Sequence, residues 1–189
     1  MKRILAIALL TTSLAASAQA AAIVGFEAGY LTDAKEAYYS ARFGYELKAD
    51  TSLSHQLEVE IGYTEQSETQ SVAEAVMTAK GKIMPLTLNY RAEFAGTDKL
   101  GFYFGIGVGM ARTSISESGA SIAAQVITIS DHASSLAYQG FAGVTYKATD
   151  TTSLHLGVKY LKIDDIKVMG GKASVGDDFI ITAGVSLKF

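Results

Sequence analysis

The residues of this sequence with the clearest chemical potential are nine charges set inside alternating apolar segments. Residues at every second position of an extended strand share one face, so each of these charges falls opposite the apolar side chains. Five acids and four bases on one interior face can neutralise one another as ion pairs. We therefore predict an interior ion-pair network formed by Glu27, Arg42, Glu46, Glu58, Glu60, Arg91, Glu93, Lys159 and Lys188.

Other motifs with chemical potential are weaker. Gly105-Ile-Gly-Val-Gly109 is similar to a nucleotide-binding loop, but that loop joins a strand to a helix, and these glycines alternate along a strand. Asp131-His132 lies among serines, which is ordinary loop composition and offers no fixed scaffold for a hydrolase triad. His55 and His155 fall on different strands and are too few for a metal site. We expect no enzyme activity, no catalytic residue, no metal and no cofactor.

The elements that must position the charges are β-strands. The last eleven residues, 179–189, put an apolar side chain at every second position, and their length matches the roughly 9 to 11 residues of a tilted transmembrane strand. Seven further segments alternate in the same way, and none has a charge on its apolar face, as contact with lipid requires. The eight apolar faces lie within residues 24–30, 39–47, 57–63, 84–94, 100–110, 136–146, 154–160 and 179–189.

The connections and the aromatic residues supply the topology. Residues 31–38, 64–83, 111–135 and 161–178 form mostly long connections, and residues 48–56, 95–99 and 147–153 form short ones. This alternation is typical of barrels with long extracellular loops and short periplasmic turns, and aromatic residues gather at both ends of the apolar faces. We predict an all-β fold, an eight-stranded antiparallel up-and-down transmembrane β-barrel. Many glycines lie on the inward face, where they make room for long side chains.

Two details of the long connections remain open. Residues 122–129 are unusually apolar for an exposed loop, and they could extend a strand above the membrane by pairing with residues 112–118 or form a contact surface. The extension is favoured by their β-branched content. Pro85 cannot donate a ladder hydrogen bond, so we expect it at the rim or at a bulge where the fourth strand begins.

The beginning of the chain indicates export. A basic start, an apolar run and Ala18-Gln19-Ala20 form the three parts of a secretory signal, and the apolar run is shorter than the roughly 20 residues of a membrane anchor. We predict a signal peptide at residues 1–20, with cleavage after Ala22 as the alternative, and a barrel domain at residues 21–189. The remaining 169 residues carry 14 basic and 19 acidic residues and no cysteine, which excludes disulfides and gives no sign of nucleic-acid binding.

The interior charges could serve two roles. In the structural role, they let a polar lumen pack without unpaired charges. In the alternative role, Arg42 or Arg91 exchanges partners among the glutamates and opens a narrow ion path. The structural role is favoured because the interior of an eight-stranded barrel is just wide enough for its own side chains to fill it.

Three segments and the last residue carry a family resemblance. Tyr103 to Ala111, Tyr138 to Tyr146, Ser153 to Leu161 and the terminal Phe189 resemble the small eight-stranded outer-membrane barrels of the OmpA-like transmembrane, opacity and surface-antigen type. Members often have an aromatic residue and an arginine where this chain has Val158 and Lys159. The resemblance implies the outer membrane of a Gram-negative-type cell, contact with its lipid and a non-enzymatic role. It also implies that Phe189 is an assembly signal read by the barrel assembly machinery.

These observations together predict a function and its partners. We expect a structural or surface-interaction role of the adhesion type, in which the long loops meet an extracellular partner and ion pairs plug the lumen. The alternative is a small pore or carrier for ions or small apolar solutes. We further expect a monomer, with no peptidoglycan-binding domain after the barrel.

Overall fold

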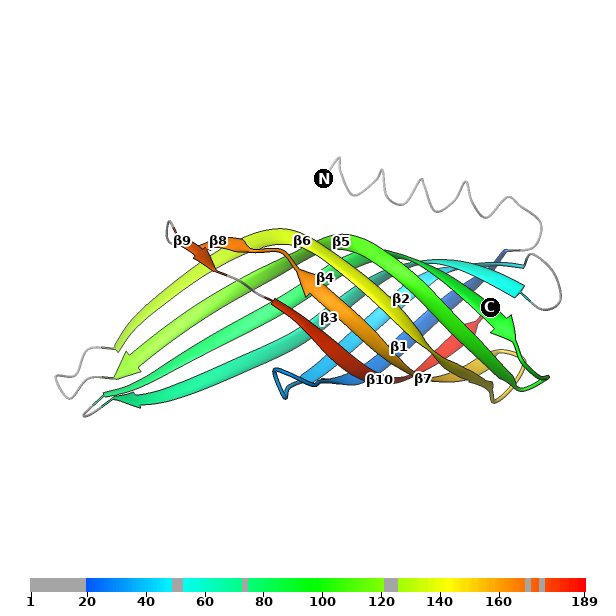
Figure 1. Ribbon diagram of the computed structural model, residues 1–189, viewed down its shortest axis with the longest axis horizontal. Helices are drawn as coiled ribbons and strands as arrows, with labels where there is room; N and C mark the ends of the chain where they lie inside the picture. Colours follow the sequence, from blue (N-terminus) through cyan, green and yellow to red (C-terminus); the bar gives the residue numbers. More distant parts are fainter. Residues whose placement is uncertain (1–19, 49–52, 73–74, 121–125, 169–170, 174–175) are drawn as a thin grey trace.

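The protein forms a closed antiparallel barrel of eight strands (Figure 1). The computed structural model describes residues 20–48, 53–72, 75–120, 126–168, 171–173 and 176–189. Each barrel strand pairs with its neighbours in sequence, and the first pairs with the last, which confirms the predicted fold. No helix among the described residues is long and apolar enough to cross a membrane. The barrel strands are β1 (Ala20–Leu31), β2 (Ala37–Lys48), β3 (Leu53–Val72), β4 (Ala75–Ala95), β5 (Leu100–Ala120), β6 (Val126–Lys147), β7 (Thr152–Ile163) and β10 (Gly176–Lys188).

The seam that closes the barrel joins β1 to β10. Their pairing runs without interruption from Ile23 opposite Lys188 to Leu31 opposite Ile180. Beyond this ladder, the backbone N–H of Phe189 donates to the carbonyl oxygen of Ala22 at 2.9 Å. The last residue is therefore hydrogen-bonded to the first strand, and its ring is 75% exposed on the outer surface.

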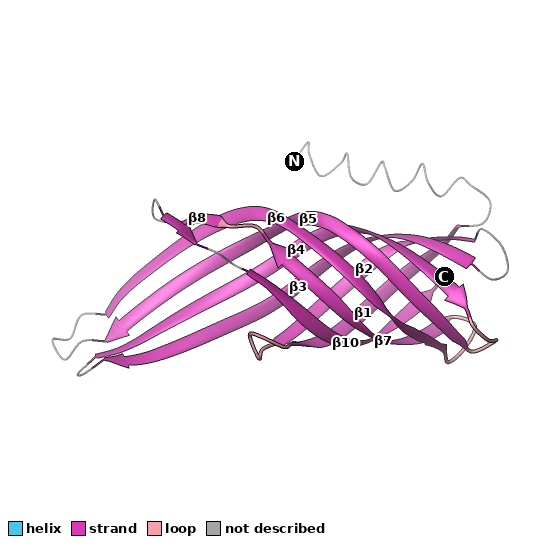
Figure 2. Ribbon diagram, in the orientation of Figure 1, coloured by secondary structure: helices cyan, strands magenta, loops and turns pink. Residues whose placement is uncertain are grey.

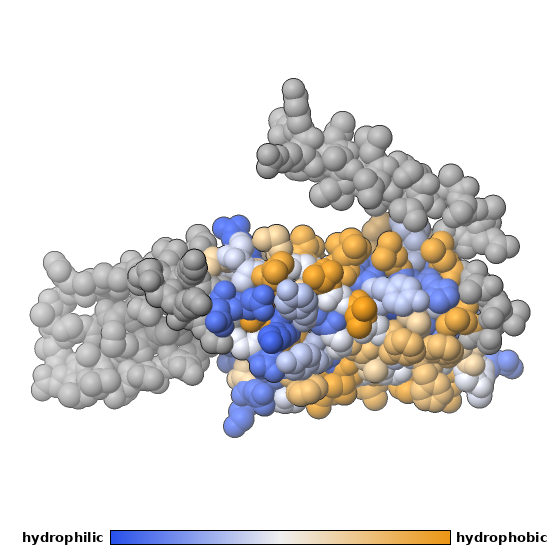
Figure 3. All heavy atoms as spheres, turned by 45° about the horizontal axis from the view of Figure 1, so that its top comes forward, coloured by the Kyte–Doolittle hydropathy of each residue, from blue (hydrophilic) through white to orange (hydrophobic). Residues whose placement is uncertain are grey.

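The outer surface carries the predicted lipid face. Every large apolar side chain that the structure exposes belongs to one of the eight predicted apolar faces, among them Phe26, Ile106 and Ile181. Ala92 is the exception on that face, because it is buried. On the face seen in Figure 3, apolar residues cover much of the barrel and hydrophilic residues gather toward the end from which the long hairpins leave. This belt gives the molecule an outside that suits hydrocarbon.

Four strands are much longer than a membrane requires, which corrects the predicted loops at 64–83 and 111–135. β3, β4, β5 and β6 contain 20, 21, 21 and 22 residues, against the roughly 9 to 11 that span a bilayer. Pairing continues from Glu65 opposite Lys82 to Val72 opposite Ala75, and from Arg112 opposite Ser134 to Ala120 opposite Val126. The strands continue because the two arms of each hairpin satisfy each other's backbone groups without help from the barrel. They project as a curved sheet, drawn almost entirely as strand in Figure 2.

Of the two open details of the long connections, the strand extension is confirmed and the predicted position of Pro85 is wrong. Residues 126–129 extend β6 and pair with residues 117–120, which confirms the strand extension; residues 122–125 lie outside the described residues. Pro85 does not mark the start of β4, which begins at Ala75. Pairing of β3 with β4 runs up to Ile61 opposite Leu86 and resumes at Thr64 opposite Ile83 in the same register. The expected bulge is therefore wrong: no residue is inserted, and the ladder is only interrupted beside the residue that lacks an N–H.

The remaining connections are compact. The Thr97 and Thr149 hydroxyls accept backbone N–H groups of the short turns, at 3.0 Å from Leu100 and 2.9 Å from Thr152. The connection between β7 and β10 carries a small hairpin of β8 (Ile166–Val168) and β9 (Gly171–Ala173), which pair with each other and with no barrel strand among the described residues. In Figure 1 this hairpin lies beside the upper part of β6.

Candidate functional site: the lumen

The lumen receives all nine charges singled out in the sequence, because each lies at an inward position of its strand. The pairs in the structure are Glu27 with Arg42 at 3.0 Å, Glu27 with Lys159 at 3.3 Å, Glu60 with Lys159, Glu93 with Arg91 at 3.2 Å, and Glu46 with Lys188. Glu58 lies 3.9 Å from the Nε of Arg42. The last of these pairs, Glu46 with Lys188, is partly exposed, whereas Arg42, Glu58, Glu60, Arg91 and Lys159 are almost fully buried.

Lys159 is the central cation of the middle of the lumen. It projects from β7 and joins Glu27 on β1 to Glu60 on β3. Glu60 also accepts hydrogen bonds from the Tyr38 hydroxyl at 3.2 Å, the Asn89 amide at 2.8 Å and the Gln139 amide at 3.1 Å. One carboxylate thus has partners from four other strands, so its buried charge is well compensated.

Arg91 organises a second layer nearer the short turns. Its Nη2 donates to the Glu93 carboxylate at 3.2 Å and to Nδ1 of His155 at 3.0 Å, and its guanidinium lies 3.7 Å from the centre of the Tyr103 ring. A guanidinium can only donate, so Nδ1 of His155 must be the acceptor and the ring proton must be on Nε2. That nitrogen lies 2.6 Å from the Ser186 hydroxyl, which therefore accepts. The layer fixes one tautomer of the histidine.

Glycines leave the space that these long side chains occupy, as the sequence predicts. A Cβ added at Gly25 would come within 2.8 Å of Cγ of Arg42, and one at Gly184 within 2.6 Å of Cγ of Glu27. At Gly107 an added Cβ would lie 2.9 Å from Cγ of Gln139. Carbon atoms do not approach this closely without displacement, so residues larger than glycine at these positions would crowd the network.

An apolar layer fills the outer end of the lumen. It contains Tyr38, whose hydroxyl reaches down to Glu60, and Ile180, and both side chains are fully buried. The alternation of the sequence puts Ile180 on the inward face without indicating what it packs against. The whole layer consists of Leu31, Tyr38, Ile83, Ala111, Ala137, Leu161, Ile163 and Ile180.

One small cavity remains between the ion pairs. It is lined by Arg42, Glu58, Phe141 and neighbouring side chains, and it has room for about one water molecule. Among the described residues, neither carboxylate oxygen of Glu58 has a hydrogen-bond partner, and Nη2 of Arg42 has none. A single water in the cavity could bridge such groups.

Several residues of the network were not singled out in the sequence. Asn89 and Gln139 occupy inward positions of predicted strands, so the alternation that identified the charges could have found them. Tyr38 and Asp178 fell in the predicted connections 31–38 and 161–178. Extending the second and the last strands by a few residues with the same alternation would have placed both inside.

Asp178 fastens the turn between β1 and β2 to β10. Its Oδ1 accepts the backbone N–H groups of Thr32 and Asp33, each at 3.0 Å, and its Oδ2 accepts that of Ala34 at 2.9 Å. The Thr32 hydroxyl donates to Oδ1 as well, at 3.2 Å. Charged acceptors of backbone N–H groups form the stronger class of hydrogen bonds. This carboxylate therefore fixes the outer rim beside the seam.

The two histidines that the sequence set aside as a metal pair, His55 and His155, lie far apart in their surroundings. His155 lies inside the Arg91 layer, whereas His55 lies on the outer surface, where its Nδ1 is 2.6 Å from the Tyr90 hydroxyl. Asp131 and His132 lie on the projecting part of β6, and their side chains fall outside the described part of the chain. Within the described residues, no three His, Asp or Glu side chains are placed to share a metal ion.

Comparison with known proteins supports the fold. The structure is similar to Neisserial surface protein A, with a TM-score of 0.58 and 15% identity over 90% of this chain and 96% of that one. It is also similar to the attachment invasion locus protein Ail of Yersinia pestis in complex with the heparin analogue sucrose octasulfate, with a TM-score of 0.51 and 17% identity over 90% and 97%.

An enzyme shares the fold too. The outer membrane protease OmpT of Escherichia coli has a TM-score of 0.55 and 9% identity over 82% of this chain and 64% of that one. Identities this low show the fold alone. No curated protein matches the sequence. The family model of the outer membrane protein β-barrel domain matches residues 4–189, and the chain belongs to that family.

Proposed function

We propose that this outer-membrane barrel is a non-enzymatic surface-interaction protein whose lumen is closed and whose projecting hairpins contact an extracellular partner. The observation that carries the proposal is the length of β3 to β6, each about twice what the bilayer needs. The extra residues contribute nothing to crossing the membrane. They form a paired sheet that projects from the barrel on the side that long connections mark as extracellular.

The filled lumen argues against the pore or carrier. The ion pairs, the Arg91 layer and the apolar layer occupy successive levels of the barrel, and the cavity between Arg42, Glu58 and Phe141 has room for about one water. Opening a path would require several buried charges to lose their partners together, at a cost of several kcal/mol each. We therefore assign the charges a structural role.

The hairpins do not have the charge of a polyanion receptor. Residues 64–83 and 111–135 together contain three basic and five acidic residues. The likeness to Ail bound to a heparin analogue concerns the fold and suggests an adhesion assay rather than a ligand. The balanced charge favours recognition by backbone and neutral polar groups over attraction of sulfated sugars.

The export and assembly of the protein complete the proposal. Residues 1–20 would be the signal peptide and residues 21–189 the barrel. Processing after Ala20 fits better than processing after Ala22, because Ala22 accepts the Phe189 N–H. N-terminal sequencing of the protein from outer membranes would distinguish the two sites.

The test of the function is a hairpin-shortened barrel. Replacing residues 66–80 and 114–134 with two-residue turns should leave the heat-modifiable barrel intact and abolish adhesion of expressing cells to host-cell and matrix-coated surfaces. A control that replaces the short turn at residues 96–99 should adhere like the parent. Adhesion that persists after the loss of both hairpins, once detected in the parent, would remove the basis of the proposal.

A further inference from the structure

The projecting sheet ends in two open edges. Above the barrel, β6 pairs with β5 on one side, but its pairing with β7 ends at Ala137 opposite Ile163. At the other side of the sheet, pairing of β3 with β2 ends at Thr64 opposite Tyr38. Within the described residues, no strand pairs with residues 126–136 of β6 or with residues 66–72 of β3 on their outer sides. Figure 1 shows the four strands leaving the barrel together.

The register identifies which backbone groups of β6 face the open side. The carbonyl of Leu136 accepts the N–H of Asp164, so the backbone groups of Leu136 point toward the β7 side. In an antiparallel strand, these groups alternate in direction from one residue to the next. The pairing of β5 with β6 keeps one register from Leu100 opposite Tyr146 to Ala120 opposite Val126. Thr128, Ser130, His132 and Ser134 therefore present their N–H and C=O groups to the open edge.

The features that usually protect an edge are missing from the upper part of β6. Proteins block open edges with charges, proline or bulges. Residues 126–130 read Val-Ile-Thr-Ile-Ser, with neither charge nor proline, and the constant register excludes a bulge there. β8 lies beside β6 but pairs only with β9, and it begins two residues after Asp164, at the lower end of this edge. In the described part of this connection, no strand pairs with the upper edge of β6.

The two edges are complementary in direction. β3 runs from the short-turn end toward the hairpin tips, and β6 runs back. Two copies inserted the same way in one membrane can therefore join β6 of one to β3 of the other as an antiparallel pair. Joining β6 to β6 in one membrane would give a parallel pair, which is less stable per residue. Residues 66–72 of β3 contain a single charge, Glu68, so no cluster of like charges opposes the contact.

We propose that copies of this protein associate head to tail in the outer membrane, through backbone pairing of the upper β6 edge of one copy with the upper β3 edge of the next. The contact is heterologous, so it can continue into rows rather than close into a two-fold dimer. An edge of a few residues buries much less surface than a stable soluble interface. In the membrane both copies are already confined and oriented, which lowers the entropic cost of association. The proposal departs from the expected monomer and does not depend on an extracellular partner.

Cysteine trapping in intact cells tests the proposal, because the chain has no cysteine of its own. One copy carries Ser130→Cys, and a co-expressed, size-tagged copy carries a single cysteine at one of positions 66–71 in turn. We expect a disulfide-linked heterodimer for a subset of adjacent β3 positions, at least tenfold above the dimer yield of two copies that both carry Lys99→Cys, which reports random collision at the short turns. Signal at no β3 position above this level, or more Ser130 to Ser130 dimer than heterodimer, would overturn head-to-tail pairing.

A proline in the open edge tests whether the copies associate through backbone hydrogen bonds or through side-chain contacts. Thr128→Pro removes an N–H that faces the open side and leaves the hydrogen bonds to β5 in place, so the heterodimer yield should fall at least tenfold. Thr128→Val keeps the N–H and should leave the yield unchanged. Heat-modifiable migration of both variants verifies that the barrel is folded. Unchanged trapping with Thr128→Pro in a folded barrel would show that edge pairing does not hold the copies together.

Discussion

Lys159 on β7 and Glu60 on β3 form an ion pair across the lumen, although 99 positions separate them in the chain. Both side chains are almost completely buried, and Lys159 also contacts Glu27 at 3.3 Å. Lys159→Met should lower the free energy of unfolding by about 3 to 5 kcal/mol, because two carboxylates lose their shared cation. Urea titration of the barrel in lipid vesicles measures this.

The same pair provides its own controls. Lys159→Arg keeps the charge and should lose much less stability than Lys159→Met. Adding Glu60→Gln to Lys159→Met should recover part of the loss, because one uncompensated charge disappears. Equal stability of the Met variant and the parent would mean that the ion pairs do not hold the lumen together.

Asp178 should be important for the order of the outer rim. Asp178→Ala removes an acceptor shared by three backbone N–H groups and a hydroxyl, and unpaired groups of this kind cost about 1 to 3 kcal/mol. We expect faster hydrogen exchange at residues 32–34 and a modest loss of stability. Asp177→Ala is the neighbouring control, since Asp177 is exposed and bonds the outward Tyr160 hydroxyl. Unchanged hydrogen exchange at residues 32–34 in the Asp178 variant would show that this carboxylate does not hold the turn in place.

Glycine at position 107 should be required by the packing of the lumen. Gly107→Ala brings a Cβ against Asn89 and within 2.9 Å of Cγ of Gln139, and overpacking of this kind costs about 1 to 3 kcal/mol. Gly140→Ala is the matched control, because a Cβ there meets no atom within 4 Å. Thermal unfolding followed by heat-modifiable migration compares the two. Similar losses of stability in both variants would show that strand propensity, not packing in the lumen, accounts for the effect of replacing Gly107.

A lumen plugged as proposed should not conduct. The purified barrel in planar bilayers is expected to show no steady channels, because buried side chains of the Arg91 layer and of the apolar layer project into its interior. Arg42→Ala and Arg91→Ala variants should also lack regular unitary conductance. Steady channels in the parent that these substitutions alter would show that the charges form a gate and that the lumen is not plugged.

The terminal aromatic residue should govern assembly rather than the final stability. Deleting Phe189 should lower the amount of folded barrel in the outer membrane severalfold, and Phe189→Tyr should restore it. Its ring is largely exposed, and only its backbone N–H is bonded within the described chain, so little packing energy is lost. Quantitative blotting of outer-membrane fractions measures the effect. Normal amounts of the deletion variant would count against the assembly role.

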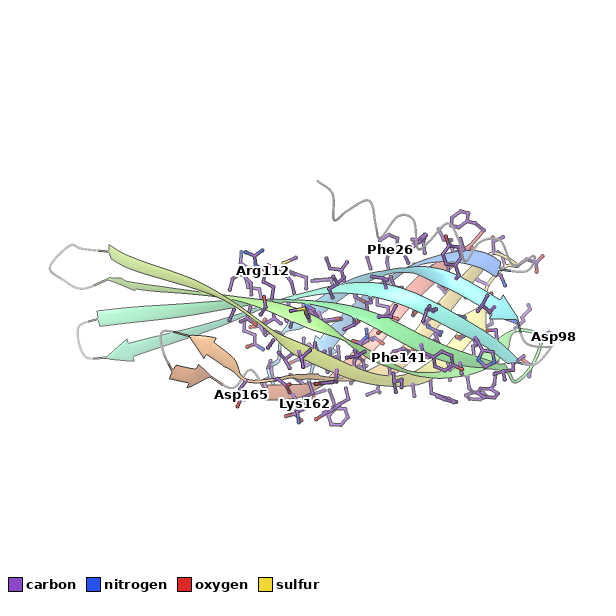
Figure 4. All side chains as sticks on the ribbon, turned by 90° about the horizontal axis from the view of Figure 1, so that it is seen from above. Phe26, Asp98, Arg112, Phe141, Lys162 and Asp165 are labelled. Atoms are coloured by element: carbon purple, nitrogen blue, oxygen red, sulfur yellow. The ribbon has the colours of Figure 1, made fainter. Side chains whose placement is uncertain are left out.

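The vertical order of residues along the barrel follows from the alternating strands, but the ends of the strands do not (Figure 4). Arg112 and Lys162 lie at the end of the barrel from which the hairpins leave, and Asp98 lies at the opposite end. The sequence predicts correctly which residues lie at the hairpin end and which at the short-turn end, since each strand crosses the membrane once. Alternation alone predicts ends of the third to sixth strands that are too early, however, because the apolar face stops where these strands leave the membrane. Strand pairing above the membrane needs no apolar face.

The sequence by itself determined which face each residue of a barrel strand presents, because a strand repeats every two residues and lipid tolerates no charge near its centre. That rule placed Glu27, Glu60 and Lys159 inside. Only the tertiary structure decided that these three meet, because their contact depends on the stagger of strands around a closed barrel, which local alternation does not encode. The contact of Asp178 with the turn between β1 and β2 and the open edge of β6 were likewise decided by long-range pairing.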